Sequence, residues 1–575
     1  MTVPDPDNSQ WQDALQIIEF TRRSLFLTGK AGTGKSTFLR YVAQHSKKKH
    51  VVLAPTGIAA INAGGATLHS FFRLPFHPLL PNDSRYDRKH IRETLKYSGE
   101  HRKLLRETEL IIIDEISMVR ADIIDFIDKV LRIYTRHDEP FGGKQLLLVG
   151  DIFQLEPVLK EEDRQLLAPF YASPYFFHAR VWQQMQLVSI ELRKVYRQHD
   201  DQFISILDRI RLNQATLQDL QTLNARVEKS TGATDAPDHA TLRITLATRR
   251  DTVDYINEQR LSQLDGAPTL FRGWVQDDFP ENAYPTPIEL LVKPGAQVIF
   301  IRNDKDKRWV NGTLGTITGI DEEEGIISVQ TEDGVEHDVE REVWENVRYT
   351  FNEKEQKIEE ELLGTYTQFP IRLAWAITVH KSQGLTFTQA RIDLTGGAFA
   401  AGQTYVALSR CTSLQGITLS APIRRQDIFV RAEVVQFSRQ YNNQQLIGQA
   451  MQESQADRYY HDAVVAFNQG DYPSFLDHFF LAIHSRYDIE KPLPRRFIRM
   501  KLQAFNRLRQ ENEQLRREAQ AQRKTMQRLA TEYVMLGKEC EQEHIIDAAI
   551  RNYEKALEIF PGQPEATRRL KKLRK

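Results

Sequence analysis

The chain has 575 residues, more than a single hydrophobic core can organise, so we expect roughly three to five domains. Apolar residues make up 41% and charged residues 27% of the chain, and no apolar run approaches the roughly 20 residues of a bilayer helix. We therefore expect no membrane span. Basic and acidic residues number 77 each, so any bound nucleic acid would have to lie in a locally basic groove.

The N-terminal segment MTVPDPDNSQW lacks the basic, apolar and small-residue order of a secretory signal, which predicts a cytoplasmic protein. The two cysteines, Cys411 and Cys540, lie far apart and outside any CxxC spacing. This spacing predicts reduced thiols rather than a metal site or a disulfide framework.

Short apolar runs alternate with amphipathic stretches from Ser24 to about Val188. These runs are SLFLTG, HVVLAP, ELIIIDE, KQLLLVG and QLVSIEL. Apolar runs in this arrangement are typical of buried parallel strands, so residues 1–190 are predicted to form an α/β domain.

A second series of apolar runs predicts another α/β domain over residues 191–430. Its runs are RITLATR, GAQVIFI, RIDL and GITLS. Within this domain, residues 319–366 alternate strand-like pieces with glycine and acidic turns, which favours a small inserted β-barrel.

Residues 431–575 are predicted to form an all-α region. The stretch from Phe497 to Leu529 is rich in Arg, Gln and Glu with apolar residues at helical spacing, which indicates a long exposed helix or a coiled-coil arm. A tetratricopeptide pattern follows, and a weaker one includes Gly470 and Ala482. The residues in register with the better pattern are Tyr533, Leu536, Gly537, Ala549, Tyr553, Ala556 and Pro561.

A phosphate-binding loop is predicted directly after the strand SLFLT, where GKAGTGKS fits the pattern GxxxxGK[ST]. Its backbone amides would wrap phosphates at a helix N-terminus, Lys35 would neutralise the phosphate oxygens, and Ser36 would reach Mg²⁺. The predicted nucleotide-binding residues are Gly29, Ala31, Gly32, Thr33, Gly34, Lys35, Ser36 and Thr37. The alternative, a chance glycine-rich turn, does not account for the acidic pair downstream.

That pair is Asp114 and Glu115, at the C-terminal end of the apolar run LIII. Ligands of α/β proteins bind at this edge of the sheet. Asp114 is therefore predicted to hold Mg²⁺, and Glu115 to orient or deprotonate the attacking water. The alternative is a solvated carboxylate pair at a strand end.

Further segments resemble the Pif family of superfamily 1 DNA helicases, in the order of the family's motifs. They are APTGIAA from Ala54, GGATLHSFF from Gly64, DEISM from Asp114, GDIFQLEPV from Gly150, VYRQ from Val195, TVHKSQGLT from Thr378 and YVALSR from Tyr405. The resemblance covers residues 8–425. It implies two RecA-like parallel-sheet domains, a wedge insert at residues 73–109, and an SH3-like identity for the β insert at 319–366.

The resemblance also implies roles in ATP hydrolysis. Arg197 and Arg410 would act as arginine fingers supplied in cis, and Gln154 would sense the γ-phosphate. Gln12 would read adenine, with Gln10 as the rival for that role, and Gly384 joins the nucleotide-binding set.

For nucleic acid, the resemblance assigns contacts to the family's DNA-binding segments. The residues are Thr56, Thr67, His69, Phe71, Asn311, His380 and Thr386. Aromatic side chains that could stack on bases are Phe71, Phe72, Phe153, Trp309 and Trp375, although an aromatic beside a sheet is more often part of the core. The family has proline where this chain has Glu156, so the resemblance does not predict the local turn at this position or the DNA contact expected there.

The leading hypothesis is an ATP- and Mg²⁺-dependent helicase that moves 5′ to 3′ on single-stranded DNA and unwinds duplex, forked or G-quadruplex DNA. The resemblance implies roles in DNA repair, recombination and telomere maintenance, a monomeric motor, and a bacterial-type, nucleoid-associated location. A protein partner is expected at the helical tail, and no membrane. The alternatives are a recombination-nuclease motor subunit, a relaxase helicase, and a tetratricopeptide adaptor with a nucleotide switch.

Overall fold

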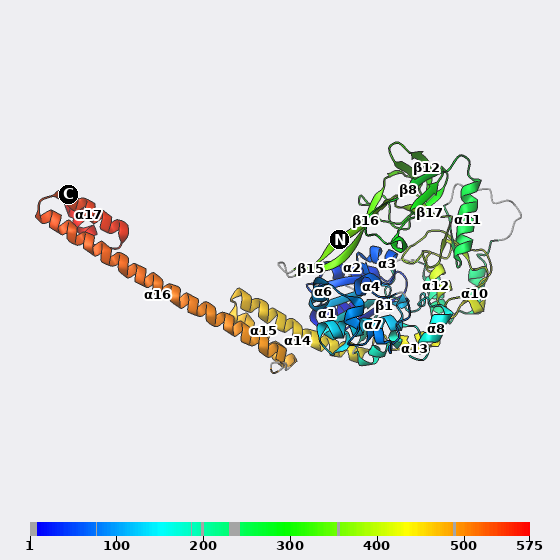
Figure 1. Ribbon diagram of the computed structural model, residues 1–575, viewed down its shortest axis with the longest axis horizontal. Helices are drawn as coiled ribbons and strands as arrows, with labels where there is room; N and C mark the ends of the chain where they lie inside the picture. Colours follow the sequence, from blue (N-terminus) through cyan, green and yellow to red (C-terminus); the bar gives the residue numbers. More distant parts are fainter. Residues whose placement is uncertain are drawn as a thin grey trace. The chain divides into compact units, whose positions relative to one another are not determined.

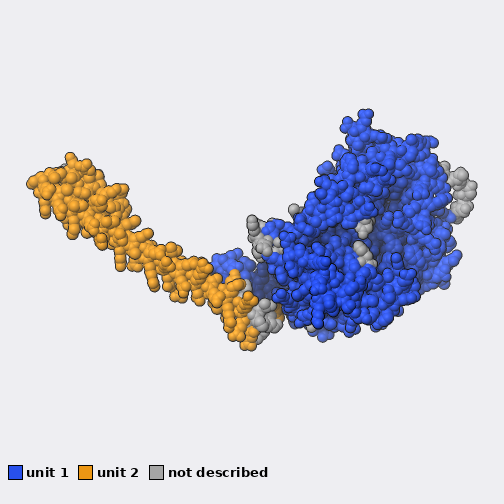
Figure 2. Space-filling view, in the orientation of Figure 1, with its two compact units in different colours: residues 1–471 blue, residues 472–575 orange. Residues whose placement is uncertain are grey.

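The computed structural model describes residues 8–75, 77–185, 187–196, 200–228, 242–352, 357–486, 490 and 492–574. It divides into two compact units, residues 1–471 and residues 472–575, which Figure 2 colours separately. Among the described residues, no helix is long and apolar enough to cross a membrane.

The first α/β domain, where Figure 1 labels α1, α2 and β1, is built on a six-stranded parallel sheet. The strand order of this sheet is β3-β2-β4-β5-β1-β6. The strands are β1 (Leu25–Gly29), β2 (His50–Ala54), β3 (Ala66–Thr67), β4 (Leu110–Ile113), β5 (Gln145–Val149) and β6 (Val188–Leu192). Its helices are α1 (Ser9–Phe20), α2 (Lys35–His45), α3 (Gly57–Ala63), α4 (Leu68–Phe72), α7 (Ala121–Thr135) and α8 (Glu161–Leu167). Strands β1, β4 and β5 are buried along their whole length, which explains their continuous apolar runs.

A second parallel sheet has the order β18-β7-β19-β20. Its strands are β7 (Ile244–Ala247), β18 (Ala376–Thr378), β19 (Ala390–Asp393) and β20 (Ile417–Leu419), and its helices are α9 (Asp201–Arg211), α10 (Leu217–Asn224), α11 (Arg250–Gln263) and α12 (Gln403–Leu408). Two parallel-sheet layers confirm the predicted fold class. The run GAQVIFI, however, does not belong to this sheet.

That run forms β11 (Gln297–Phe300), which pairs antiparallel with β12 and β17 in a five-stranded sheet, so its assignment to the parallel sheet was wrong. The other strands of this sheet are β12 (Leu314–Asp321), β13 (Ile326–Thr331), β14 (Glu336–Val339) and β17 (Ile371–Leu373). All four residues of β11 are buried. The sequence of a fully buried strand is apolar whether its neighbouring strands run parallel or antiparallel, so the apolar run could not show the direction of pairing.

The β region is longer than the predicted residues 319–366. It also includes the pair β8 (Thr269–Arg272) and β10 (Glu289–Val292), and a sheet of β9 (Trp274–Asp277), β15 (Glu342–Asn352) and β16 (Lys357–Gln368). The hairpin β15–β16 contacts the first domain, where Tyr349 Oη lies 3.4 Å from the backbone nitrogen of Val52.

Residues 73–109, the predicted wedge, contain α5 (Ile91–Leu95) and α6 (Gly99–Glu107). Their apolar side chains, such as Leu79 and Leu104, belong to the hydrophobic core of the first domain. The strand-separating role of this segment remains a prediction.

The first unit continues beyond the predicted domain boundary at residue 430. Helix α13 (Ala432–Ser438) contributes Phe437 to the hydrophobic core of the first domain, where its ring stacks on Phe177 at 4.3 Å between ring centres. Helix α14 (Gln444–Gln469) packs on α1, where Gln16 donates to Ser454 at 2.7 Å. Arg23, just after α1, pairs with Glu453 at 2.6 Å. The first 41 residues of the predicted tail therefore belong to the first unit. The boundary was wrong because an amphipathic helix does not show in its sequence which core it covers.

The second unit contains α15 (Tyr472–Ser485), α16 (Pro492–Gln542), α17 (Ile546–Ile559) and α18 (Pro564–Leu573). A small core joins the end of α16 to α17 and α18 through Val534, Tyr553 and Leu570. Gly537 makes room for Tyr553, because an added Cβ would lie 2.5 Å from its ring. The helical tail is confirmed, and the predicted arm Phe497–Leu529 lies within α16.

A buried arginine joins the two parallel-sheet domains. Arg211, at the end of α9, donates to Asp151 at 3.0 Å and to Glu191 at 3.0 Å, both of which belong to the first domain. The Arg211 side chain is 4% exposed and that of Asp151 is fully buried. Its guanidinium also lies 4.3 Å from the centre of the Phe153 ring.

We expect Arg211→Ala to lower the free energy of unfolding by about 3–5 kcal/mol, because it leaves two carboxylates without a counter-charge in a dry interface. Urea denaturation measures this loss. Arg209→Ala, on the same helix, is the matched control, since its partly exposed ion pair with Asp219 contributes about 1 kcal/mol or less. Equal losses in the two variants would contradict the role of Arg211.

We further expect a chain ending at Asp471 to unfold cooperatively at the denaturant concentration that unfolds the first unit of the full chain. A chain ending at Val430 should unfold much earlier, because loss of Phe437 alone is worth about 3–5 kcal/mol. Fluorescence-detected denaturation of both chains tests this, with Phe437→Ala in the full chain as reference. Identical midpoints for the two truncations would show that α13 and α14 do not support the first unit.

Candidate functional site

The loop between β1 and α2 has the geometry of an anion site. Gly34 is the N-cap of α2 with φ +88°, a conformation that favours glycine, so the first amides of the helix face the loop. Lys35 Nζ donates to the carbonyl oxygens of Gly29 at 2.7 Å and Lys30 at 2.9 Å. The ammonium group therefore lies across the loop, where it can bind phosphate oxygens.

The other predicted loop residues divide into buried and accessible ones. Thr33 is buried and its hydroxyl donates to the Lys30 carbonyl at 2.9 Å, which stabilises the loop itself. Ser36 is exposed and Thr37 half-buried on the first turn of α2. The amide of Ala31 donates to Tyr405 Oη at 3.1 Å, so α12 of the second domain touches the loop directly.

The two predicted carboxylates follow β4 beside this loop. Glu115 has φ +47°, an uncommon conformation for a residue with a side chain, and its amide donates to Asp114 Oδ1 at 2.9 Å. Removal from water and the charge of Asp114 raise the pKa of Glu115 to about 7, against the opposing effects of Lys35 and Arg410. Burial likewise raises the pKa of Asp114. Lys35, the acidic pair and Arg410 therefore share one electrostatic site.

Arg410 enters this site from the second domain. Its side chain is buried and donates to the carbonyls of Val406 at 3.0 Å and Ser382 at 3.3 Å. These contacts link Arg410, the first predicted arginine finger, to the segment TVHKSQGLT.

The second predicted arginine finger, Arg197, lies outside the described residues. Gly384, with φ +78°, is exposed in the same segment as Ser382.

Gln154 lies where the two domains meet. It is 7% exposed, and an added Cβ on Gly402, at the start of α12, would lie 2.3 Å from its carbonyl oxygen. The backbone of the GDIFQLEPV segment and the first turn of α12 are thus in close contact. Glu156, at the position of the family proline, forms an ion pair with Arg431 at 3.1 Å.

No contact of Gln12 in the described residues supports the predicted role in reading adenine, which stays a prediction. Gln12 is exposed, and the rival Gln10 is half-buried and donates to Ser9 Oγ at 3.2 Å. Tyr196 instead connects the start of α1 to the loop: its amide donates to Gly32 O at 2.8 Å and its hydroxyl accepts from Asn8 Nδ2 at 3.3 Å.

Several residues predicted to contact DNA cap or flank the helices of the first domain. Thr56 accepts from the amide of Ala59 at 3.2 Å as the N-cap of α3, and Thr67 accepts from Ser70 at 3.1 Å as the N-cap of α4. Burial lowers the pKa of the half-buried His69, so it is neutral at physiological pH.

The remaining predicted DNA residues lie in the second domain and the β region. Asn311 donates to Asn62 Oδ1 of α3 at 3.5 Å and so connects to the first domain. Burial lowers the pKa of His380, whose ring is stacked 6.4 Å from Phe399, and Thr386 is half-buried nearby in sequence.

The stacking role predicted for Phe71 is corrected by its burial. Phe71 is 4% exposed and packs in the core at 4.8 Å from Phe72 and 6.2 Å from Tyr349. Phe72, Phe153 and Trp309 are also buried, and Trp375 is half-buried, so these rings serve packing. An apolar ring next to a sheet is stabilised most by burial.

Sequence reasoning missed three contributors to the site. Asp151 and Tyr405 stood inside recognised segments without an assigned role, whereas Arg211 stood in no motif. Phe399, which is 61% exposed beside His380, is an aromatic ring open to solvent that no segment pointed to.

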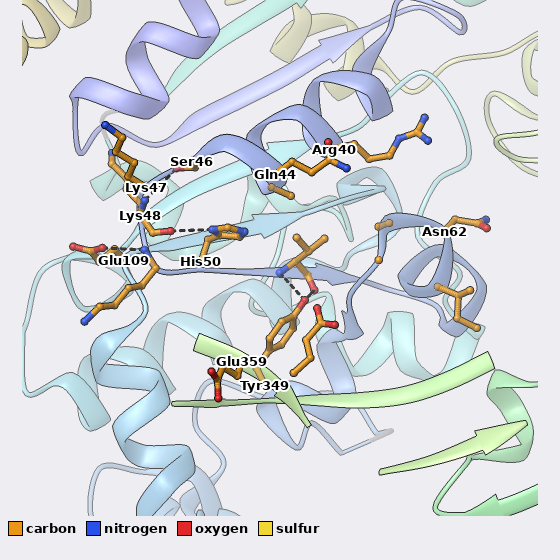
Figure 3. A pocket seen from close by; sticks show the side chains of 17 residues that line it. Arg40, Gln44, Ser46, Lys47, Lys48, His50, Asn62, Glu109, Tyr349 and Glu359 are labelled. Carbon is orange, nitrogen blue, oxygen red and sulfur yellow. Dashed lines mark hydrogen bonds between the residues drawn. The ribbon is translucent and has the colours of Figure 1, made fainter. Parts of the chain in front are cut away.

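A separate hollow of about 880 Å³ lies at the start of β2, the opposite end of the first sheet from the phosphate-type loop (Figure 3). Lys47, Lys48 and Lys49 line it together with Glu109 and Tyr349. Lys48 donates to Gln145 Oε1 at 2.7 Å and Lys49 pairs with Glu107 at 3.0 Å. Lys48 and Lys49 therefore make contacts within the first domain, and none of the predicted site residues lines the hollow.

Comparisons with known proteins agree with this arrangement. The PIF1-like helicase family matches residues 11–220. The chain is 31% identical over 444 residues to the ATP-dependent DNA helicase Pif1 of Bdellovibrio bacteriovorus, covering 76% of this chain and 92% of that protein. It is 34% identical to human ATP-dependent DNA helicase PIF1 over 72% of this chain, a match that spans only 60% of the human protein's length.

Among solved structures, Bacteroides Pif1 in complex with ADP-AlF4 is 39% identical and matches with a TM-score of 0.69, covering 76% of this chain and 97% of that one. The same Bacteroides protein has also been crystallised bound to single-stranded DNA. The relatives and the site geometry lead to one conclusion: the chain belongs to the PIF1-like helicase family.

Proposed function

We propose that this protein is an ATP-dependent DNA helicase that moves 5′ to 3′ along single-stranded DNA and unwinds the duplex ahead of it. The observation that carries the proposal is the contact of the Lys35 loop with the second domain through the Ala31–Tyr405 hydrogen bond, with Arg410 of that domain electrostatically coupled to Glu115. A phosphate bound there would contact both domains. Hydrolysis of the ATP that carries this phosphate would change the attraction between the two domains and hence the distance between them.

The residues of the loop fit an ATP–Mg²⁺ complex. The amides at the start of α2 and the Lys35 ammonium would hold the phosphates, while the accessible hydroxyl of Ser36 and the carboxylate of Asp114 would hold the ion. Burial raises the pKa values of Asp114 and Glu115, so a bound cation would stabilise the ionised form of both carboxylates. Mg²⁺ would supply charge neutralisation at the phosphates.

Glu115 is the proposed group that orients and deprotonates the attacking water. Burial raises the pKa of Glu115 above its ordinary value, which makes its carboxylate a better acceptor for the proton of the attacking water. Arg410, with its charge already within reach of Glu115, would stabilise the negative charge that develops on the transferred phosphoryl group. Gln154 would report the presence of that group to α12 through the Gly402 contact.

The DNA path we propose runs over the N-termini of α3 and α4 and across to the segment TVHKSQGLT. Thr56 and Thr67 would present hydroxyls and helix-terminal amides to phosphates, with Asn311 and His380 on the opposite side. Exposed Phe399 replaces buried Phe71 as the proposed stacking ring. Support comes from Bacteroides Pif1, which has been solved bound to single-stranded DNA, and from a Pif1 helicase structure that concerns DNA unwinding at forked duplex DNA.

We expect the protein to hydrolyse ATP at least about ten-fold faster with single-stranded DNA and to unwind a duplex carrying a 5′ tail but not one carrying a 3′ tail. Gel-based unwinding with matched duplexes measures this. Glu115→Gln should still bind ATP and DNA but lose hydrolysis and unwinding, because the amide cannot accept the water's proton.

A nucleotide switch without motor activity would show ATP binding and no stimulation by DNA, which would overturn the proposal. Unwinding of 3′-tailed duplex alone would reverse the proposed polarity. Normal turnover by Glu115→Gln would remove Glu115 from the catalytic group.

A further inference from the structure

One face of α16 carries an unbroken heptad pattern that the ATP and DNA sites do not use. Its members alternate at spacings of four and three residues, as a coiled-coil seam requires. They are Leu508, Asn512, Leu515, Ala519, Gln522, Met526 and Leu529.

This seam is open along its length. Leu508 is 65% exposed, Leu515 63%, Met526 49% and Leu529 40%. Residues 502–529 of α16 are all exposed, and burial resumes at Ala530, where α17 packs. A helix of 51 residues that exposes Leu508, Leu515, Met526 and Leu529 on one face loses stabilisation that a matching helix would supply.

The charges beside the seam identify the matching helix. With Asn512 and Ala519 at successive a positions, Glu511 and Glu518 occupy the g positions that directly precede them, and Arg516 and Arg523 occupy the e positions of the two heptads. In a parallel, in-register pair, each g residue faces the e residue five positions later on the other helix. Glu511 would thus face Arg516 of a second copy, and Glu518 would face Arg523.

From this self-complementary pattern we propose that two copies of this chain associate through a parallel coiled coil over residues 508–529. An antiparallel pair would place glutamate against glutamate and arginine against arginine, which is unfavourable. Asn512, the polar residue at an a position, would fix the register and restrict the assembly to two strands at some cost in stability.

The contacts that the seam-flanking charged residues make within their own helix are weak enough to be exchanged for contacts between two copies. Glu511 pairs with Arg507 of its own helix at 3.0 Å, but both side chains are more than half exposed. Such an i,i+4 pair contributes only about 0.3–0.5 kcal/mol, so exchange for a contact beside a buried seam is favourable. The proposal does not depend on the proposed helicase activity, because it concerns α16 alone.

Sedimentation equilibrium of the full chain tests it, with 66.6 kDa as the mass of one copy. We expect a dimer whose dissociation constant rises at least about ten-fold in Arg516→Glu/Arg523→Glu and in Glu511→Arg/Glu518→Arg, because each variant opposes like charges. Mixing the two variants should restore association as a heterodimer. The matched control is Arg517→Glu/Lys524→Glu, which makes the same charge change on the outer face and should associate like the parent chain.

Orientation is tested with Leu515→Cys in a Cys540→Ser background. Parallel, in-register helices place the two thiols opposite each other, so mild oxidation should cross-link the copies, whereas Arg517→Cys should not. A monomeric parent chain up to about 50 µM, equal weakening by the outer-face control, or absence of the Leu515→Cys cross-link would each overturn the proposal. Circular dichroism checks that every variant keeps its helix content.

Discussion

The guanidinium of Arg211, buried between Asp151 and Glu191, is the interaction on which the two-domain site depends. It extends from α9 of the second domain into the carboxyl edge of the first sheet. Charges buried away from water tolerate little displacement, since each loses its compensation as the pair separates. The pair therefore fixes where α9 and the helices beside it stand relative to the phosphate-type loop.

The consequences appear at the loop itself. Tyr405 of α12 accepts a hydrogen bond from Ala31, and Gly402 at the start of the same helix lies against the carbonyls of Phe153 and Gln154. Arg410, two residues beyond the end of α12, is electrostatically coupled to Glu115. A group bound by the loop would therefore lie beside residues of both parallel-sheet domains. This shared contact is the physical basis for coupling phosphate chemistry to domain movement.

The sequence predicted best what local chemistry determines. A strand followed by GKAGTGKS, and another followed by Asp114 and Glu115, specify their own backbone geometry, and the resulting loop and strand ends lie where expected. Prediction failed where the answer depends on distant partners. The run of β11 is apolar in any sheet, Phe71 reads equally as a stacking ring or a core residue, and Arg211 belongs to no pattern at all.

The helical tail also shows that periodicity in the sequence does not identify the distant partners of a helix. Periodicity predicted helices after Val430, but α13 and α14 complete the first unit through Phe437 and Glu453, contacts that no periodicity encodes. Conversely, α16 exposes its apolar row among the described residues of the second unit. Its charge pattern carries information about a partner that the fold of one chain does not use.

The most direct test of the account is the distance between the two parallel-sheet domains during nucleotide binding. Fluorophores attached to Arg106→Cys in α6 and Tyr255→Cys in α11, in a Cys540→Ser background, report this distance by energy transfer. Addition of Mg²⁺ with ADP-AlF4 should change the transfer efficiency reversibly, and Lys35→Ala should abolish the change. An unchanged efficiency in a protein that demonstrably binds the nucleotide would contradict the claim that the phosphate site controls the position of the domains.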